Sequence, residues 1–197
     1  TVFMREFEHF NFLQQEVLPG FRRSEEHRKD LGIWCAAAST GQEPYTLAML
    51  LKDFFGWEHP QWDTRILATD VSTDALEKAV LGRYSREQIM TLPEAWRRRY
   101  FRLSQDRQNY EVTGEIKQEI IFRRFNLMDV FPFKRKMHIV FLRNVMIYFD
   151  KETKAKLVQK VYDVMEPGGY LFVGQTETID KENNPFELIQ PSIFRKA

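Results

Sequence analysis

The sequence predicts an α/β protein built on an open, largely parallel sheet. Residues 31–51 contain a short apolar run, a turn of small residues and a helical pattern, in that order. A second apolar run at residues 64–69 follows and closes with Asp70. Two later runs, at 120–125 and 137–142, also end in polar residues. Strands that alternate with helices form parallel sheets, and ligands bind where their carboxyl ends meet, so these runs predict a sheet with a ligand site at one edge.

The composition fits a single globular domain and excludes several function classes. The chain has 197 residues, 43% of them hydrophobic, which suffices for one α/β domain with a full core. No apolar run approaches the roughly 20 residues of a membrane span, and the first ten residues carry charges where a signal peptide would be apolar. A net charge of +1 argues against a general nucleic-acid binder. We therefore expect no membrane insertion and no nucleic-acid partner.

The single cysteine and the four histidines suggest no redox or metal chemistry. One cysteine excludes an internal disulfide, which favours a reducing, cytoplasmic setting. Cys35 stands in a run of small apolar residues, so we interpret it as part of the core and not as a nucleophile. The histidines are scattered without the spacing of metal ligands, so we expect no metal site.

Residues 1–18 are predicted to form one helix. Apolar residues recur there at steps of three and four, which gives a helix one buried face. Pro19 and Gly20 are expected to end the helix, and a charged connector follows over residues 21–30. Arg5 lies off the apolar stripe, so it is free to point toward the edge of the sheet. The stripe consists of Phe3, Phe7, Phe10, Leu13 and Val17.

The segment after the first strand is the predicted ligand-binding turn. Its small residues let the backbone approach a ligand closely, and Pro44 begins a helix whose N-terminus offers unpaired N–H groups. Gly41 is the only glycine of this turn, so an ordinary α/β turn is the alternative. Asp70 is placed to accept hydrogen bonds from both hydroxyls of a ribose, with a helix-capping or surface acid as its alternative. Ser72 or Thr73 can cap the helix that follows.

The stretch before the third apolar run changes character. Residues 82–99 are polar and suit two helical pieces. Residues 100–121 alternate as strands do, with residues 115–120 as the third of three strands. We predict a small antiparallel meander at 100–121, inserted into an α/β domain that spans residues 1–197.

The last part of the chain returns to the alternation of strands and helices. Residues 137–142 form a strand that ends at Arg143 and Asn144, and Asp150 is placed to cap the next helix. Residues 186–195 alternate weakly and are predicted to form a final pair of strands. Because parallel strands end at the same edge of a sheet, the polar ends of the four predicted strands should converge there.

Six segments match, in order, the motifs of a known family. The two most specific strings are A-S-T-G-Q-E-P-Y at residues 38–45 and R-N-V-M-I-Y-F-D at residues 143–150. The other four are T-V-F-M-R (1–5), L-A-T-D-V-S (67–72), F-N-L (125–127) and P-G-G-Y-L-F-V-G-Q-T-E (167–177). With these motifs the chain resembles the CheR-type chemotaxis receptor methyltransferases, which use S-adenosylmethionine to methylate glutamate side chains on chemoreceptors. The resemblance implies the fold of the class I S-adenosylmethionine-dependent methyltransferases, a Rossmann-like sheet with a small inserted antiparallel β-subdomain.

The resemblance also implies how the cofactor is bound. Glu43 and the turn around Ala38 would hold the methionine part of S-adenosylmethionine. Asp70 would bind the ribose, as its place after the second strand suggests independently. Asn126 and Leu127 would flank the adenine.

The same resemblance implies a reaction end of the pocket. Asn144, with Val145 beside it, would close the cofactor pocket. Thr1 and Arg5 would line the end that carries the methyl group. Tyr148 would face the reaction centre, which makes Arg5 and Tyr148 the candidate catalytic residues.

A chemoreceptor is the partner that the resemblance implies. The expected substrate is its cytoplasmic helical domain, and in some family members the insert, here residues 100–121, binds the receptor's C-terminal peptide as an added strand. Family members usually carry a helical N-terminal domain, so we interpret this chain as the C-terminal catalytic domain without it. Met4, Gln42 and Leu142 stand where the family usually has phenylalanine, glutamate and cysteine. No stretch indicates an obligate interface, so we expect a monomer.

The expected methyl transfer requires mainly that the substrate carboxylate be correctly oriented. A glutamate carboxylate is ionised near pH 7, so no general base is required, and Arg5 or Tyr148 could orient it. A dehydrogenase is disfavoured because a pyrophosphate requires a glycine-rich turn and Glu43 would repel it. A non-catalytic cofactor-binding or scaffold module and a methyltransferase for another substrate stay open as alternatives.

Overall fold

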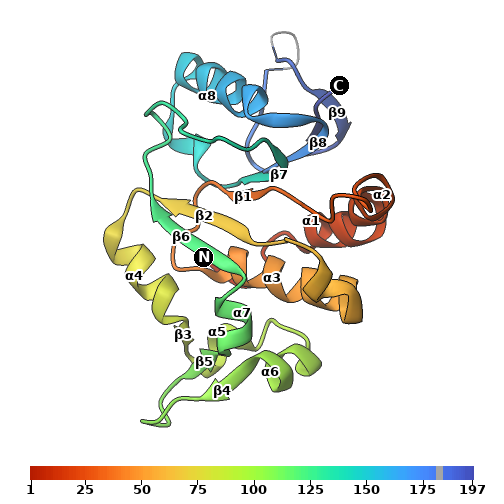
Figure 1. The fold of residues 1–197 in the computed structure, drawn as a ribbon. Helices are drawn as coiled ribbons and strands as arrows, with labels where there is room; N and C mark the ends of the chain where they lie inside the picture. The colour runs from red at the N-terminus through yellow and green to blue at the C-terminus, as the bar shows by residue number, and fades with distance from the viewer. Residues whose placement is uncertain (181–183) are drawn as a thin grey trace.

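The computed structural model describes residues 1–180 and 184–197. Its centre is a seven-stranded sheet in the order β6-β2-β1-β7-β8-β10-β9 (Figure 1). Neighbouring strands from β6 to β8 are parallel, whereas β10 runs antiparallel to β8 and to β9. The strands are β1 (Ile33–Cys35), β2 (Ile66–Asp70), β6 (Ile120–Arg124), β7 (Met137–Leu142), β8 (Met165–Val173), β9 (Glu187–Gln190) and β10 (Ile193–Arg195). The predicted α/β class and the predicted final pair of strands are thereby confirmed.

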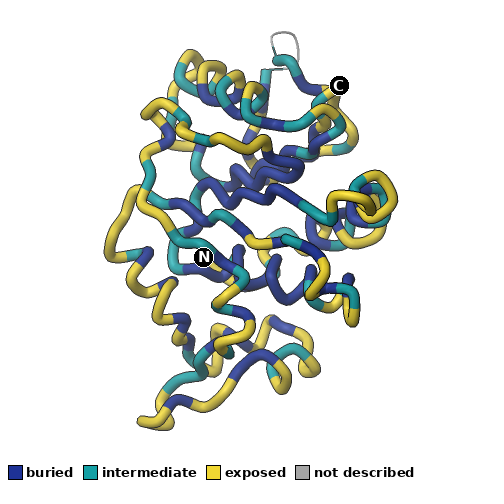
Figure 2. Tube along the Cα trace, viewed as in Figure 1, coloured by how far each residue is buried: buried dark blue, intermediate teal, exposed yellow. Residues whose placement is uncertain are grey.

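Alternate residues of the central strands face two separate layers. Ile33 and Cys35 belong to the apolar cluster that includes α1 to α3, whereas Trp34 between them belongs to the cluster that includes α8. This alternation follows from the period of two along a strand, and it makes the central strands the most deeply buried part of the chain (Figure 2). The main helices are α3 (Gln42–Phe55), α4 (Thr73–Leu81) and α8 (Lys151–Asp163), with short 3₁₀ turns η2 (Gly56–Gln61) and η3 (Met146–Tyr148). Ser72 caps α4 and Asp150 caps α8, as predicted.

The N-terminal segment differs from the predicted single helix. Residues 1–6 are not helical, and two left-handed residues there, Met4 and Glu6, interrupt any helix before Phe7. Phe7 itself is 54% exposed and does not belong to the buried stripe. The helix also does not end at Pro19, because Pro19 falls in the first turn of α2, where a missing N–H is tolerated. The observed elements are α1 (Phe7–Phe12), a π-helical turn η1 (Leu13–Val17) and α2 (Leu18–Ser24).

A second sheet of three antiparallel strands lies between α4 and β6 in the chain, below the main sheet in Figure 1. Its order is β3-β5-β4, and its third strand comes from residues before the predicted meander, not from residues 115–120. Residues 114–117 form a helix, so the prediction of a strand over residues 115–120 was wrong. The elements are β3 (Arg83–Tyr84), α5 (Arg86–Ile89), α6 (Glu94–Tyr100), β4 (Phe101–Leu103), β5 (Tyr110–Val112) and α7 (Gly114–Lys117).

The topology brings the ends of four strands to one edge of the main sheet. β1, β2, β6 and β7 are parallel neighbours, so the residues that follow them are close together. Main-chain hydrogen bonds continue past the strand ends, from Ala36 N to Phe141 O at 2.9 Å and from Ala38 N to Thr69 O at 2.8 Å. The predicted convergence of polar strand ends is confirmed.

Candidate functional site

A cavity of about 350 Å³ opens at this edge of the sheet. Its volume lies within the roughly 300–1,000 Å³ typical of small-molecule sites. Eight of the ten residues named from the sequence line it, and Asn126 and Leu127 do not. The eight are Thr1, Arg5, Ala38, Glu43, Asp70, Asn144, Val145 and Tyr148.

The turn after β1 is fixed by its backbone conformation and by contacts with the side chains of Asp70 and Tyr84. Ser39 has a left-handed conformation with φ of 49°, and its N–H donates to Asp70 Oδ2 at 2.8 Å. Gly41 has φ of 95°, and a Cβ at this position would lie 2.8 Å from the hydroxyl oxygen of Tyr84. Only glycine therefore fits there without strain. The predicted small-residue turn is thus held between β2 and the small antiparallel sheet.

Asp70 stands at the end of β2 with both carboxylate oxygens engaged by backbone groups. Oδ2 accepts from the N–H of Ser39 and Oδ1 accepts from the N–H of Ser72, at 2.8 and 2.9 Å. A carboxylate offers about four acceptor positions, so two remain for hydroxyl groups of a ligand. The cap of α4 is the Ser72 side chain, which accepts from Ala75 N, so the helix-capping alternative for Asp70 is not needed.

Asn126 and Leu127 follow β6 but lie outside the cavity lining. The Asn126 Oδ1 accepts from the N–H of Met128 at 3.0 Å and thereby closes a local turn. Leu127 is buried in the apolar cluster on the α8 side of the sheet. The segment nevertheless runs beside Asp70, because Phe125 N donates to the Asp70 carbonyl at 2.9 Å. An adenine contact at these two residues stays a prediction.

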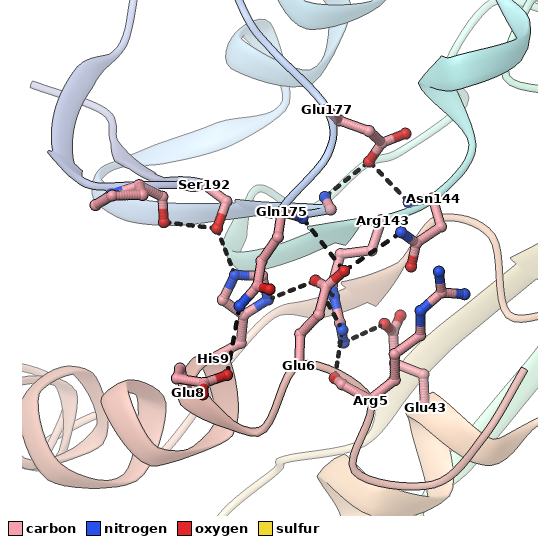
Figure 3. Close-up of polar contacts among 12 residues, drawn as sticks. Arg5, Glu6, Glu8, His9, Glu43, Arg143, Asn144, Gln175, Glu177 and Ser192 are labelled. Carbon is pink, nitrogen blue, oxygen red and sulfur yellow. Dashed lines mark hydrogen bonds and ion pairs between the residues drawn. The ribbon is translucent and has the colours of Figure 1, made fainter.

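A buried arginine organises the opposite wall of the cavity (Figure 3). The side chain of Arg143 is only 2% exposed, and it follows β7 directly. Its Nη1 donates to Glu43 Oε2 at 2.8 Å and its Nη2 donates to Glu6 Oε2 at 3.0 Å. Nη2 also donates to the main-chain oxygen of Arg5. One guanidinium thus ties the N-terminal segment and α3 to the end of β7.

The pKa values of the two carboxylates that flank Arg143 are shifted in opposite directions. Burial alone would raise the pKa of Glu6, but the Arg143 charge and hydrogen bonds from Gln175 and Asn144 outweigh it and hold that pKa below its usual value. Burial raises the pKa of Glu43, although Arg143 opposes the change. Burial also raises the pKa of the Cys35 thiol well above its usual value, and Cys35 has no exposed surface, so its interpretation as a core residue is confirmed.

Arg5 lies in the irregular segment before α1, and not on a helix as the sequence pattern predicted. It is exposed and lines the cavity, and its guanidinium has no hydrogen-bond or ion-pair partner among residues 1–180 and 184–197. Tyr148, at the end of η3, is 78% exposed, which excludes a tyrosine packed into the core. The Thr1 hydroxyl donates to Ser39 Oγ at 3.1 Å and so joins the N-terminal segment to the turn after β1.

Two further residues of this wall, Glu6 and Arg143, are not among the site residues predicted from the sequence. They are 137 positions apart, and the sequence around Glu6 marks neither a strand end nor a periodic stripe. Arg143 stands after a predicted strand and within the R-N-V-M-I-Y-F-D string, but neither feature indicated its pairing with Glu6. In the part of the chain that the structure describes, no helix is long and apolar enough to cross a membrane. No group of three or more metal-binding side chains occurs among these same residues.

Known proteins match this chain over nearly its whole length. The profile of the CheR methyltransferase SAM-binding domain matches residues 1–194. The chemotaxis protein methyltransferase of Borreliella burgdorferi is 37% identical, covering 100% of this chain and 70% of that protein. The protein of the same name from Escherichia coli is 33% identical, covering 98% of this chain and 66% of that protein.

Solved structures are more distant. A glycopeptide N-methyltransferase complexed with S-adenosylmethionine has a TM-score of 0.44 and 14% identity, covering 73% of this chain and 46% of that one. This chain belongs to the CheR family of chemotaxis protein methyltransferases, which bind S-adenosylmethionine.

Proposed function

We propose that this domain transfers a methyl group from S-adenosylmethionine to glutamate side chains of a chemoreceptor, with Arg5 and Tyr148 orienting the carboxylate. Family membership supplies the methyltransferase activity and the cofactor. The single observation that supports the residue roles is the exposed guanidinium of Arg5, which has no partner within residues 1–180 and 184–197 and lines a cavity that Tyr148 and Asp70 also line. A carboxylate that enters this cavity can therefore pair with the Arg5 guanidinium at its edge.

The cavity suits S-adenosylmethionine on its own chemistry. This cofactor supplies a methyl group on a positively charged sulfonium, which is already activated for transfer. The small side chains of Ala38 and Ser39 leave the turn open to a close approach. Asp70 retains two acceptor positions for the ribose hydroxyls. Glu43 gives one oxygen to Arg143 and keeps acceptor capacity for the ammonium group of the methionine part.

Arg5 and Tyr148 act by orientation, not by proton transfer. The substrate carboxylate is ionised near pH 7, so neither residue has to remove a proton. A guanidinium that pairs with the non-attacking oxygen fixes the direction of the other oxygen without neutralising it. The exposed Tyr148 hydroxyl can donate to the same group. Such positioning can supply roughly 7–11 kcal/mol of a displacement barrier.

We assign a second receptor-binding surface, separate from the cavity that takes the glutamate side chain, to the small three-stranded sheet. β3 and β4 are its outer strands, so each presents one edge that is not paired within that sheet. An extended C-terminal peptide of the receptor can add to such an edge by main-chain hydrogen bonds. The cytoplasmic helical domain of the receptor would then place its glutamates at the cavity.

The chemical outcome can be tested directly. The domain is incubated with methyl-labelled S-adenosylmethionine and the cytoplasmic fragment of a chemoreceptor, and the product is treated with alkali. We expect labelled methanol to be released, because carboxyl methyl esters hydrolyse in base. A control receptor fragment with its candidate glutamates changed to alanine should take up no label. Label that resists alkali, or no label above the control, would contradict the proposal.

A further inference from the structure

Glu177 is a buried acid that no step of the proposed mechanism uses. It follows β8 in a turn whose Glu177 N–H donates to the Gly174 carbonyl at 2.8 Å, and it is 7% exposed. No lysine or arginine pairs with it in the part of the chain that the structure describes. Its partners are instead four backbone N–H groups: Asn144 at 2.7 Å and Gly174 at 2.7 Å on Oε2, and Met146 at 2.6 Å and Ile147 at 3.3 Å on Oε1.

Three of these donors belong to the loop at residues 143–148, which forms one wall of the cavity. Arg143, Asn144, Val145 and Tyr148 of this loop all line the cavity. The loop carries the 3₁₀ turn η3, which begins with two of the N–H groups that Glu177 accepts. Glu177 thus accepts hydrogen bonds from the backbone of the loop (Figure 3), but it is not among the residues that line the cavity.

The loop needs this support because its backbone is strained. Asn144 has φ of 57°, a left-handed conformation that L-residues adopt at a cost. Its N–H faces the Glu177 carboxylate, and its side-chain amide faces Glu6 Oε1 at 3.4 Å. Without the carboxylate, buried N–H groups of a strained segment would lose their acceptors.

A carboxylate is the side chain that these contacts require. Each of its two oxygens accepts from two N–H groups, and it has no hydrogen to oppose them. A glutamine would turn an NH₂ group toward backbone donors at one of the two positions. The neighbouring Gly174 is equally constrained, since a Cβ there would lie 2.6 Å from Asn144 Nδ2 and 2.8 Å from Glu177 Oε2.

We propose that Glu177 is a positioning residue of methyl transfer. It fixes loop 143–148 so that Asn144 and Tyr148 face the cavity, and it acts only through that loop. This inference rests on the proposed function, because it assumes that Tyr148 orients the substrate carboxylate. The carboxylate of Glu177, which lies outside the cavity, would then determine how loop 143–148 is aligned.

The central test compares Glu177→Gln with Glu152→Gln, which removes a carboxylate that is 77% exposed on α8. We expect Glu177→Gln to weaken binding of S-adenosylhomocysteine about ten-fold and to lower kcat about 10- to 100-fold, in line with other losses of supporting contacts. The KM for the receptor fragment should change less than about two-fold, because the outer docking surface is untouched. The control should match the wild type in all three. Equal values for the two variants would overturn the proposal.

A purely structural role would not produce two further signatures. Tyr148→Phe and Glu177→Gln should be non-additive in kcat, the double variant being about as slow as the slower single variant. Amide hydrogen exchange should accelerate at Asn144, Met146 and Gly174 and stay unchanged in β1. Additive losses in kcat, or faster exchange throughout the sheet, would contradict a role through the loop.

Glu177→Asp keeps the proposal testable if Glu177→Gln does not fold. The shorter side chain keeps the charge but cannot reach both ends of the loop, so we expect a folded domain with kcat at least about five-fold lower. A wild-type kcat in this variant would overturn the proposal. Failure of the proposed function would look different, because the wild-type domain would then form no alkali-labile ester at all.

Discussion

The cavity has two walls that are built in different ways. The wall proposed to bind the cofactor, called the cofactor wall, is formed by the turn at residues 38–41 and by Asp70. It lies within one strand–helix–strand unit and is held by main-chain hydrogen bonds such as Ala38 N to Thr69 O. The carboxylate wall, formed by residues 1–6 and by loop 143–148, joins segments that are 137 positions apart. A buried guanidinium and a buried carboxylate hold it together.

The comparison shows which wall of the cavity depends on ion pairs between residues distant in the sequence. A turn fixed by backbone hydrogen bonds keeps its shape as long as its strands pair. A wall fixed by Arg143 depends on the ionisation and the geometry of two partners, Glu6 and Glu43. Buried ion pairs contribute little net stability, but removing one partner leaves a charge that is no longer compensated. The carboxylate wall is therefore the more fragile of the two.

The largest effect is expected from Arg143→Met. The substitution leaves the Glu6 and Glu43 carboxylates without their cation, and breaking a buried pair typically costs about 3–5 kcal/mol in free energy of unfolding. Urea titration followed by circular dichroism measures it. Arg98→Met is the control, because the Arg98 side chain is 80% exposed in its pair with Glu94 and exposed pairs contribute roughly 0–1 kcal/mol. Equal losses in the two variants would show that the wall does not depend on Arg143.

Arg5→Ala is expected to have the next largest effect, and on turnover. Loss of a contact made in the transition state of about 3–4 kcal/mol corresponds to a rate loss of roughly a hundred- to a thousand-fold. Arg5→Lys should restore only part of the rate, because an ammonium lacks the planar fork. Single-turnover methyl transfer at saturating cofactor is the readout, with S-adenosylhomocysteine binding measured separately. Near-normal turnover in the alanine variant would leave Tyr148 as the orienting residue.

Asp70→Ala should affect the cofactor wall alone. Losing hydrogen bonds to a charged group costs on the order of 1.5–3 kcal/mol, so the affinity for S-adenosylhomocysteine should fall accordingly. Titration calorimetry on the folded variant gives the value. Unchanged affinity would remove Asp70 from the ribose site.

Tyr84→Phe tests whether the small sheet supports the cofactor wall. The Tyr84 hydroxyl donates to the Thr40 carbonyl at 2.7 Å, and its ring packs edge-on against Phe3 with centroids 4.8 Å apart. We expect the affinity for S-adenosylhomocysteine to fall by about 0.5–1.5 kcal/mol. The matched control is Tyr45→Phe, which loses a buried hydroxyl bond to the Ala79 carbonyl on α4 and should spare affinity. Equal losses of affinity would argue against a specific link through Thr40.

The smallest expected effect is the dependence of stability on pH through Glu6. The pKa of Glu6 in the folded chain is lowered from the usual 4.5. The ionised carboxylate therefore contributes fully to the free energy of unfolding above pH 4.5, and this contribution is lost as the pH falls through the lower pKa of the folded chain. The difference in free energy of unfolding between wild type and Glu6→Gln should therefore shrink on acidification below about pH 4.5. Chemical denaturation across the acid range measures it. A difference that grows on acidification would mean that burial outweighs Arg143 at this carboxyl.

The sequence was most informative where structure is local. Apolar runs located β2 and β7, and the residue types after each strand predicted which ends would meet. Capping by Ser72 and Asp150 followed from short spacings. These features depend on a few neighbouring residues, so a pattern along the chain contains them.

The predictions that were wrong concern segments whose structure depends on contacts with residues far away in the sequence. The stripe over residues 1–18 suggested a helix, yet left-handed residues Met4 and Glu6 bring the segment to the cavity, where Glu6 pairs with Arg143. The third strand of the small sheet, β3, is only two residues long and pairs with β5 some 26 positions later. Neither the Glu6–Arg143 ion pair nor the pairing of β3 with β5 produces a periodic pattern in the sequence, because each depends on tertiary contacts.

Arg5 on the carboxylate wall and Asp70 on the cofactor wall are proposed to act independently of each other, and a double-mutant cycle measures whether they do. The value to measure is kcat/KM for S-adenosylmethionine in Arg5→Ala, in Asp70→Ala and in the double variant. Among the residues that the structure describes, Arg5 and Asp70 share no hydrogen-bond or ion-pair partner, so we expect their effects on free energy to add to within about 0.5 kcal/mol. An interaction energy above about 1 kcal/mol would contradict it and would show that one wall positions the other.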